Sequence, residues 1–122
     1  MPQYLALLYV PEDESVERKL WGQLPLWLEL TESLRAAGLL VANGALHRTD
    51  AATTIRVRNG ETEMTDGPFA VTKEVLAGFY VLDCDGPDEA LRHAARFPTV
   101  RYGSVEVRPI MGPGDIPVYD PA

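Results

Sequence analysis

The stretch that decides the fold is Asp66-Gly67-Pro68-Phe69, followed by Thr72-Lys73-Glu74 and Gly78-Phe79-Tyr80. The glycine permits backbone conformations closed to other residues, and the proline fixes φ, so the first of these segments predicts a tight turn. The apolar residues that follow predict a strand from about Ala77 to Cys84. Turn residues, ionisable groups and a strand therefore lie close together in this part of the chain.

Composition limits the class of protein. The chain has 122 residues, of which 46% are hydrophobic, enough for one domain with a core of its own. The 11 basic and 18 acidic residues give a net charge of −7, which opposes binding to nucleic acid. Cys84 is the single cysteine, as suits a reducing compartment. The apolar run Leu5 to Val10 is too short for a signal peptide or a membrane span. We expect a cytoplasmic protein without a nucleic-acid or membrane partner.

The first forty residues predict a strand followed by a broken helix. Gln3 to Val10 is continuously apolar, which is typical of a strand buried on both faces. From about Asp13 to Ala37 the apolar positions follow a helical stripe, consisting of Leu20, Leu24, Trp27, Thr31 and Leu34. Pro25 cannot donate to the helix ladder, so it predicts a kink or a second helix that starts there. Gly38 is placed to end the helix.

A hairpin is predicted around Asn59-Gly60, the residue pair that suits a two-residue type I′ turn. This turn sets the register of the two strands. It places opposite charges on one side and an apolar pair on the other, namely Arg58 with Glu61, Arg56 with Glu63, and Ile55 with Met64.

The remaining elements complete an α+β order. Leu39 to Leu46 predicts a second strand, the residues from Asp85 open a helix that ends before Pro98, and Gly103 to Ile110 predicts the last strand. The order is strand, helix, strand, hairpin, strand, helix, strand, which is a ferredoxin-like βαββαβ fold with an inserted β-hairpin. We expect a single domain over residues 1–110 and a C-terminal tail over residues 111–122.

Both faces of the predicted sheet are apolar. The first strand presents Tyr4, Ala6, Leu8 and Val10 on one side and Leu5, Leu7 and Tyr9 on the other. In a ferredoxin-like fold the helices cover one face, so the second apolar face requires another cover. We therefore expect a homodimer in which two copies of the sheet pack together.

The run from Thr65 to Val81, together with Gly103-Ser-Val-Glu-Val-Arg-Pro-Ile, resembles the DGPF-type branch of the YCII-related family over nearly the whole chain. The resemblance implies a dimeric α/β barrel built from two such sheets. Some members carry a histidine in the first helix that pairs with an aspartate, but residues 15–37 contain none here. The positions that match the branch are Asp66, Gly67, Pro68, Phe69, Lys73, Glu74, Gly78, Tyr80, Glu106, Arg108 and Pro109.

Five of these residues form the predicted ligand site, a cleft in each subunit lined by Asp66, Lys73, Tyr80, Glu106 and Arg108. Glu106 and Arg108 share one face of the last strand, opposite Val105 and Val107, and as a hydrogen-bonded pair they would orient an anionic or carbonyl ligand. A structural ion pair at the subunit boundary is the alternative.

The other candidate residues also have structural interpretations. Asp66 is in a position to bond its own backbone turn, Lys73 and Glu74 to form a solvated pair, and Tyr80 to lie in the core. His47 is either a general base or a solvent-facing loop residue.

No cofactor is predicted, and the two histidines lack metal-ligand spacing. Two functions remain open. One is the binding of a small polar or anionic molecule, with or without catalysis by unassigned residues. The other, implied by the frequent location of this branch beside extracytoplasmic-function sigma factors, is a non-catalytic regulatory module that associates with such a factor.

Overall fold

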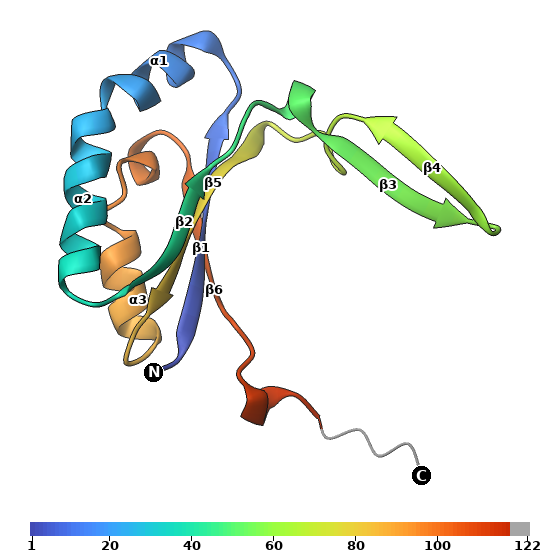
Figure 1. Cartoon of the computed structure of the whole chain (residues 1–122). Helices are drawn as coiled ribbons and strands as arrows, with labels where there is room; N and C mark the ends of the chain where they lie inside the picture. Colours follow the sequence, from blue (N-terminus) through green and yellow to red (C-terminus); the bar gives the residue numbers. More distant parts are fainter. Residues whose placement is uncertain (118–122) are drawn as a thin grey trace.

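The computed structural model describes residues 1–117, which form a mixed α+β fold (Figure 1). Four strands build one antiparallel sheet in the order β2-β5-β1-β6. Their bounds are Gln3–Pro11 for β1, Leu40–Ala45 for β2, Glu74–Asp83 for β5 and Ser104–Pro109 for β6. The helices α1 (Glu14–Gly22), α2 (Leu24–Ala36) and α3 (Pro87–Ala94) cover one face of this sheet. With the hairpin set aside, the predicted ferredoxin-like order is confirmed.

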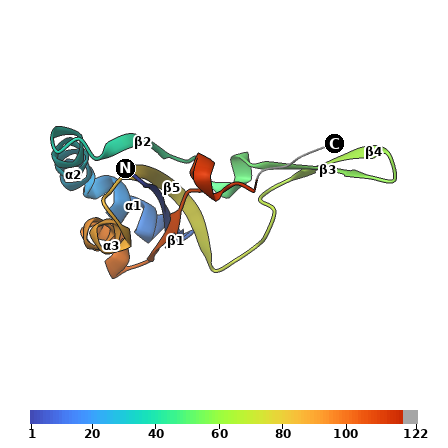
Figure 2. The same cartoon turned by 90° about the horizontal axis from the view of Figure 1, so that it is seen from below.

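Alternation along β1 separates the two faces of the sheet. Its even-numbered residues from Tyr4 to Val10 are buried beneath the helices, whereas Leu5, Leu7 and Tyr9 are half-buried on the other face. The core on the helix side is completed by residues of α2, β5, α3 and the segment after α3, namely Leu30, Leu34, Tyr80, Leu82, Cys84, Ala90, Ala94 and Phe97. The helices thus cover only one of two apolar faces (Figure 2).

The predicted helix is divided in two at Gln23, as the position of Pro25 indicated. Asp13 caps the first half, and its carboxylate accepts a hydrogen bond from the backbone N–H of Val16 at 2.9 Å. Pro25 lies in the first turn of α2, where a missing N–H costs nothing. Gly38 ends the helix with φ of 76°, the left-handed conformation expected there. None of the helices in residues 1–117 is long and apolar enough to cross a membrane.

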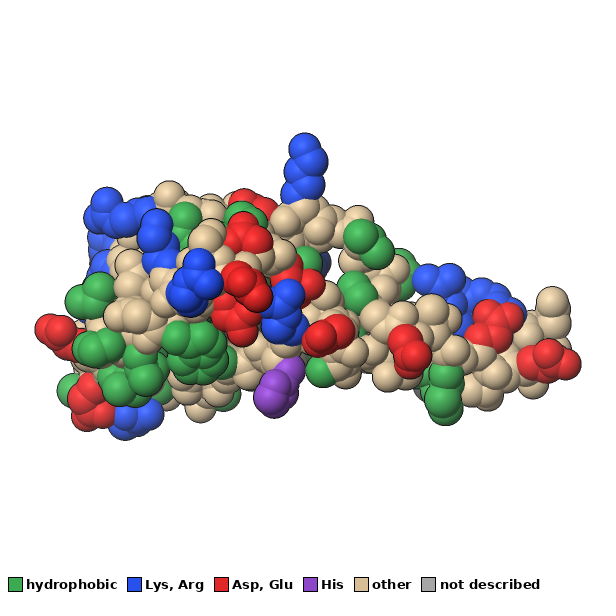
Figure 3. Space-filling model, turned by 90° about the horizontal axis from the view of Figure 1, so that it is seen from above, with side chains coloured by type: hydrophobic (Ala, Val, Ile, Leu, Met, Phe, Trp, Pro, Cys, Tyr) green, Lys and Arg blue, Asp and Glu red, His purple; other side chains and the backbone are tan. Residues whose placement is uncertain are grey.

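The hairpin forms as predicted but does not join the main sheet. Strands β3 (Thr53–Arg58) and β4 (Glu61–Asp66) pair with each other in the expected register, and both residues of the turn have positive φ. The hairpin projects from the body of the molecule as an arm (Figures 1 and 3). Its apolar residues Ile55, Val57 and Met64 are exposed.

Replacement of Gly60 by valine is expected to destabilise the hairpin. Gly60 has φ of 77°, and a β-branched residue in this conformation is strained. The expected loss of unfolding free energy is about 1 kcal/mol or more, measured by urea denaturation. Gly22→Ala is the control, because a Cβ at Gly22 meets no atom within 4 Å and its φ is not positive. Equal stability of the two variants would contradict the strain argument.

Several strand boundaries differ from the sequence prediction, among them both ends of β2, which spans Leu40–Ala45 rather than Leu39 to Leu46. β5 begins at Glu74 rather than near Ala77, because its first residues pair with Val10 and Pro11 at the end of β1. β6 begins at Ser104, one residue after the predicted start. The predicted tail includes a short 3₁₀ turn at Pro113–Asp115, and its last five residues lie outside the described part of the chain.

Candidate functional site

A cavity of about 440 Å³ lies on the helix side of the sheet. Its walls come from α1 and α2, from the end of β1, and from the neighbouring strands β2 and β5. Pockets of this size are typical of small-molecule sites. We call it the helix–sheet pocket.

The floor of the helix–sheet pocket is made by buried residues, including Leu8, Val10, Gly78, Tyr80 and Thr99. The hydroxyl of Thr31 donates a hydrogen bond to the carbonyl oxygen of Trp27 at 2.7 Å and accepts one from the hydroxyl of Tyr80 at 2.6 Å. The ring of Trp27 stacks on Tyr80, with centroids 6.3 Å apart. These contacts hold the floor in one arrangement.

Two buried side-chain polar atoms of the described lining residues have no hydrogen-bond partner. They are the indole Nε1 of Trp27 and the hydroxyl Oγ1 of Thr99, both buried. The side chain of Thr99 is 0% exposed. A buried donor without a partner costs free energy, so each such atom calls for an explanation.

The rim of the pocket is acidic. It contains the carboxylates of Glu12, Asp13, Glu17 and Asp50, against the single guanidinium of Arg48 and the imidazole of His47. Figure 3 shows acidic and basic side chains gathered on the face above α1, with hydrophobic side chains beside them.

Most rim carboxylates are held by contacts within the chain. Arg48 donates a hydrogen bond to Glu17 at 2.5 Å, and this contact raises the pKa of the guanidinium. Glu12 accepts hydrogen bonds from the hydroxyl and the backbone N–H of Thr49, which lower the pKa of its carboxyl group. These bonds tie the turn after β2 to the end of β1.

Large apolar side chains also border the opening. Trp21 is 60% exposed and Leu28 is 61% exposed, and Leu24, Leu46 and Leu76 lie at the same mouth with smaller exposed fractions. An exposed group of this kind is a common feature of binding surfaces. The pocket therefore combines an apolar wall with an acidic rim.

The five residues of the predicted cleft do not meet within one chain. Tyr80 lines the helix–sheet pocket. Glu106 and Arg108 are exposed on the opposite face of the sheet, because Val105 and Val107 pack against the core. Asp66 ends β4 and Lys73 precedes β5, and both are exposed.

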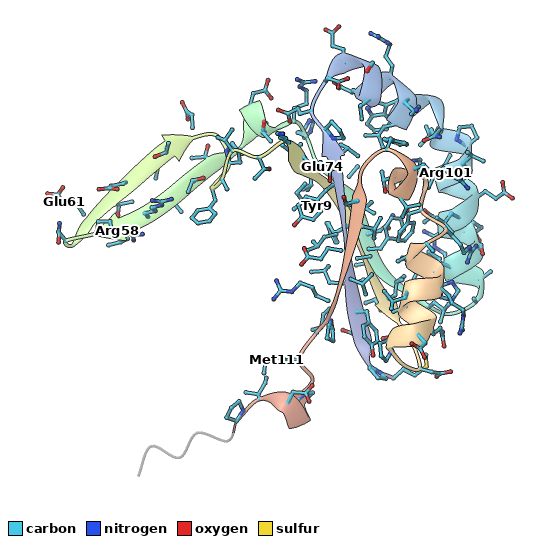
Figure 4. All side chains as sticks on the ribbon, turned by 180° about the vertical axis from the view of Figure 1, so that it is seen from behind. Tyr9, Arg58, Glu61, Glu74, Arg101 and Met111 are labelled. Atoms are coloured by element: carbon cyan, nitrogen blue, oxygen red, sulfur yellow. The ribbon has the colours of Figure 1, made fainter. Side chains whose placement is uncertain are left out.

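The predicted hydrogen-bonded pair of Glu106 and Arg108 is also absent within the described chain. None of the ion pairs formed by residues 1–117 includes Arg108. Glu106 instead accepts a hydrogen bond from the hydroxyl of Tyr9 at 3.4 Å, and Glu74 accepts one from Ser104 at 2.7 Å. Figure 4 shows Tyr9 and Glu74 on this uncovered side of the sheet. Partial burial and the carboxylate of Glu106 raise the pKa of Tyr9.

Sequence reasoning missed most of the pocket. The sequence feature that could best have located the pocket is Thr31, a polar residue in an otherwise apolar helical stripe. Thr99 has no comparable feature in the sequence. His47, for which both a functional and a solvent-facing interpretation were open, is exposed at the rim.

The remaining candidates for chemistry lie away from the pocket. The pKa of Cys84 is raised by burial and by the nearby acids Glu89, Asp83 and Asp85. In the described part of the chain no group of three or more His, Cys, Asp and Glu residues is placed to hold a metal ion.

Two comparisons with known proteins identify the family. The family model of the YCII-related domain matches residues 4–112. An uncharacterized protein of Rhizobium meliloti (strain 1021) is 43% identical over 110 residues, which cover 87% of this chain and 83% of that protein. The match extends from the second residue of β1 to beyond β6, so it includes both the sheet and the walls of the pocket. The chain therefore belongs to the family of YCII-related domains.

Proposed function

We propose that the protein binds a small molecule in the helix–sheet pocket. The observation that carries this proposal is the pocket itself, a cavity of about 440 Å³ with an apolar wall and a small number of polar groups. This combination is typical of ligand sites. The family assignment does not name a ligand. We further propose that the chain belongs to the DGPF-type branch of the family, because it contains the turn Asp66-Gly67-Pro68-Phe69.

Replacement of Ala45 by phenylalanine is expected to abolish ligand binding. Ala45 pairs with Gly78 across the sheet and lines the pocket, so a phenyl ring there fills the cavity from its β2 wall. Ligands are found by a thermal-shift screen of small molecules, and binding is followed by tryptophan fluorescence, because both tryptophans of the chain line the pocket.

Ala95→Phe is the matched control. Ala95 is exposed after α3 and does not line the pocket, so the same change in volume leaves binding intact. A ligand that binds both variants equally well would place the site elsewhere, and the uncovered sheet face with Glu106 and Arg108 would become the candidate.

We also propose that the protein is a homodimer joined through the uncovered face of the sheet. On this face Leu5 faces Val81 and Leu7 faces Phe79 in neighbouring strands, and Tyr9 continues the row. A contiguous apolar patch of this kind on a soluble domain favours an interface. The arm supports the same proposal, since an isolated two-stranded hairpin is marginally stable in water and its apolar residues need cover.

In such a dimer Glu106 and Arg108 border the interface, because in β6 they lie directly opposite Leu7 and Leu5 of β1. The proposed dimer would therefore enclose two of the five residues predicted from the sequence. Catalysis and association with a sigma factor remain predictions from the family resemblance.

A further inference from the structure

The arm, residues 53–66, has one apolar face and one charged face. Ile55, Val57 and Met64 share the apolar face, because Ile55 pairs directly with Met64 and side chains alternate along a strand. Their exposed fractions are 61%, 59% and 71%. The other face has opposite charges directly across the two strands, namely Arg56 with Glu63 and Arg58 with Glu61. An exposed face of clustered apolar side chains indicates contact with another surface.

The turn Asp66-Gly67-Pro68-Phe69 closes the root of the arm. The N–H of Gly67 donates a hydrogen bond to the carbonyl oxygen of Ala52 at 2.8 Å, and the hydroxyl of Thr54 donates to the carbonyl oxygen of Gly67 at 2.9 Å. The guanidinium of Arg56 lies 5.3 Å from the ring centroid of Phe69, so the turn also contacts the charged face. The apolar face remains exposed.

A second group of exposed apolar side chains follows the last strand, in residues 110–117, which we call the post-β6 segment. Ile110, Met111 and Ile116 are 38%, 60% and 57% exposed. The segment is held by hydrogen bonds of its own, since the N–H of Ile110 donates to the carbonyl oxygen of Gln3 at 2.9 Å and the N–H of Gly112 to the carboxylate of Asp115 at 2.8 Å.

The arm and the post-β6 segment lie at opposite ends of the main sheet. The arm is inserted before β5, whose first residues pair with the last residues of β1, whereas β6 ends opposite Tyr4 near the start of β1. Both project on the uncovered side of the sheet (Figures 1 and 2). In Figure 4, Arg58 and Glu61 at the tip of the arm lie on the same side as Tyr9, and Met111 lies beyond the other end of the sheet.

The length of the arm brings it beside a stacked partner. Each of its strands has six residues, which span about 20 Å, while packed sheets lie only about 10 Å apart. A twofold axis between the sheets and across the strands turns the partner end for end, and the contact is then self-complementary. Each arm comes beside the partner's post-β6 segment. An axis along the strands would instead bring the two arms to the same end and leave both post-β6 segments uncovered.

We infer that the arm of one protomer packs its apolar face on the post-β6 segment of its partner, so that two copies of this chain hold each other at both ends of the stacked sheets. This inference rests on the proposed homodimer and adds its orientation. It also gives the Asp66-Gly67-Pro68-Phe69 turn a role, which is to fix the root of the arm that contacts the partner.

Cross-linking tests the pairing of arm and segment. We expect the double variant Met64→Cys, Met111→Cys, treated with a short bis-maleimide, to yield a covalent dimer on a denaturing gel. Cys84 does not compete, because it is 0% exposed. Thr65→Cys with Met111→Cys is the control, since Thr65 lies on the charged face of the arm and should cross-link far less. If either Met64→Cys or Met111→Cys alone cross-links as efficiently as the pair, like segments meet and the inference is overturned.

Ile55→Glu tests the energetic contribution of the arm. Ile55 is exposed within one chain, so the monomer keeps its fold, but in the dimer the change removes an apolar contact. We expect the dissociation constant of the dimer, measured by sedimentation, to rise about tenfold or more. Thr65→Glu adds the same charge on the other face of the arm and should leave the dissociation constant unchanged.

These measurements separate the inference from the proposal on which it rests. A dimer that Leu7→Glu on the sheet face dissociates, but that Ile55→Glu leaves intact, would overturn the inference while the proposed homodimer stands. A wild-type chain that is a monomer at high concentration would overturn both. Loss of affinity in Ile55→Glu together with the cross-link between Met64→Cys and Met111→Cys supports the exchange of arms.

Discussion

Replacing Leu7 with glutamate is expected to dissociate the proposed homodimer into monomers. Leu7 lies in the middle of the uncovered sheet face, between Phe79 of β5 and Glu106 of β6. In a single chain this side chain is half-buried, so a carboxylate there keeps much of its hydration. In the proposed dimer the carboxylate would be buried beside another acid without a partner.

Burial of an unpaired charge costs several kcal/mol, so the dissociation constant of the dimer is expected to rise by roughly a hundredfold or more. Light scattering during size-exclusion chromatography gives the mass directly. Leu91→Glu is the matched control, because Leu91 is exposed on the outer side of α3 and the same change there leaves the dimer intact. A wild-type chain that is a monomer at high concentration would end the dimer proposal.

Among the glycines, Gly103 is the position where replacement by alanine is expected to destabilise the protein most. A Cβ at Gly103 would lie 2.1 Å from the carbonyl oxygen of Tyr9, closer than any real contact of this type. The neighbouring atom is backbone in β1, so the clash cannot be relieved by rotation of a side chain.

The strand that starts at Ser104 must then move away from β1, which disturbs the pairing of Ser104 with Tyr9. Overpacking of this severity costs roughly 3 kcal/mol or more, seen as a lower urea midpoint. Gly22→Ala adds the same methyl group in open space at the end of α1 and is expected to be neutral or slightly stabilising. Equal urea midpoints for the two variants would contradict this prediction, because they would mean that β6 can move away from Tyr9 without a loss of stability.

Local patterns determined the elements of the fold. The left-handed preference of Asn59 and Gly60 determined the hairpin turn and its register, since turn geometry depends on adjacent residues only. Pro25 determined the division of the first helix, because a residue without an N–H interrupts a helix wherever it occurs. The continuous apolar run of β1 determined that both faces of the sheet are apolar, because successive side chains of a strand point to opposite faces.

The tertiary structure decided which face each strand turns to the helices, and with it the location of the candidate site. Period two places Glu106 and Arg108 on one side of β6 and the valines on the other, but the pattern alone does not decide which side the helices cover. Tyr80 lies on the helix side of the sheet and Arg108 on the uncovered side, so the residues of the predicted cleft are separated by the sheet.

The pocket itself depends on contacts between distant parts of the chain. Trp27 and Thr99 are separated by more than seventy residues in sequence, yet both line one cavity because α2 and the segment after α3 pack on the same sheet face. Their missing hydrogen bonds are a property of that packing, since a polar atom is unpartnered only with respect to all of its neighbours in space. Sequence periodicity could therefore specify the layers of this protein, while the cavity between them arose from their packing.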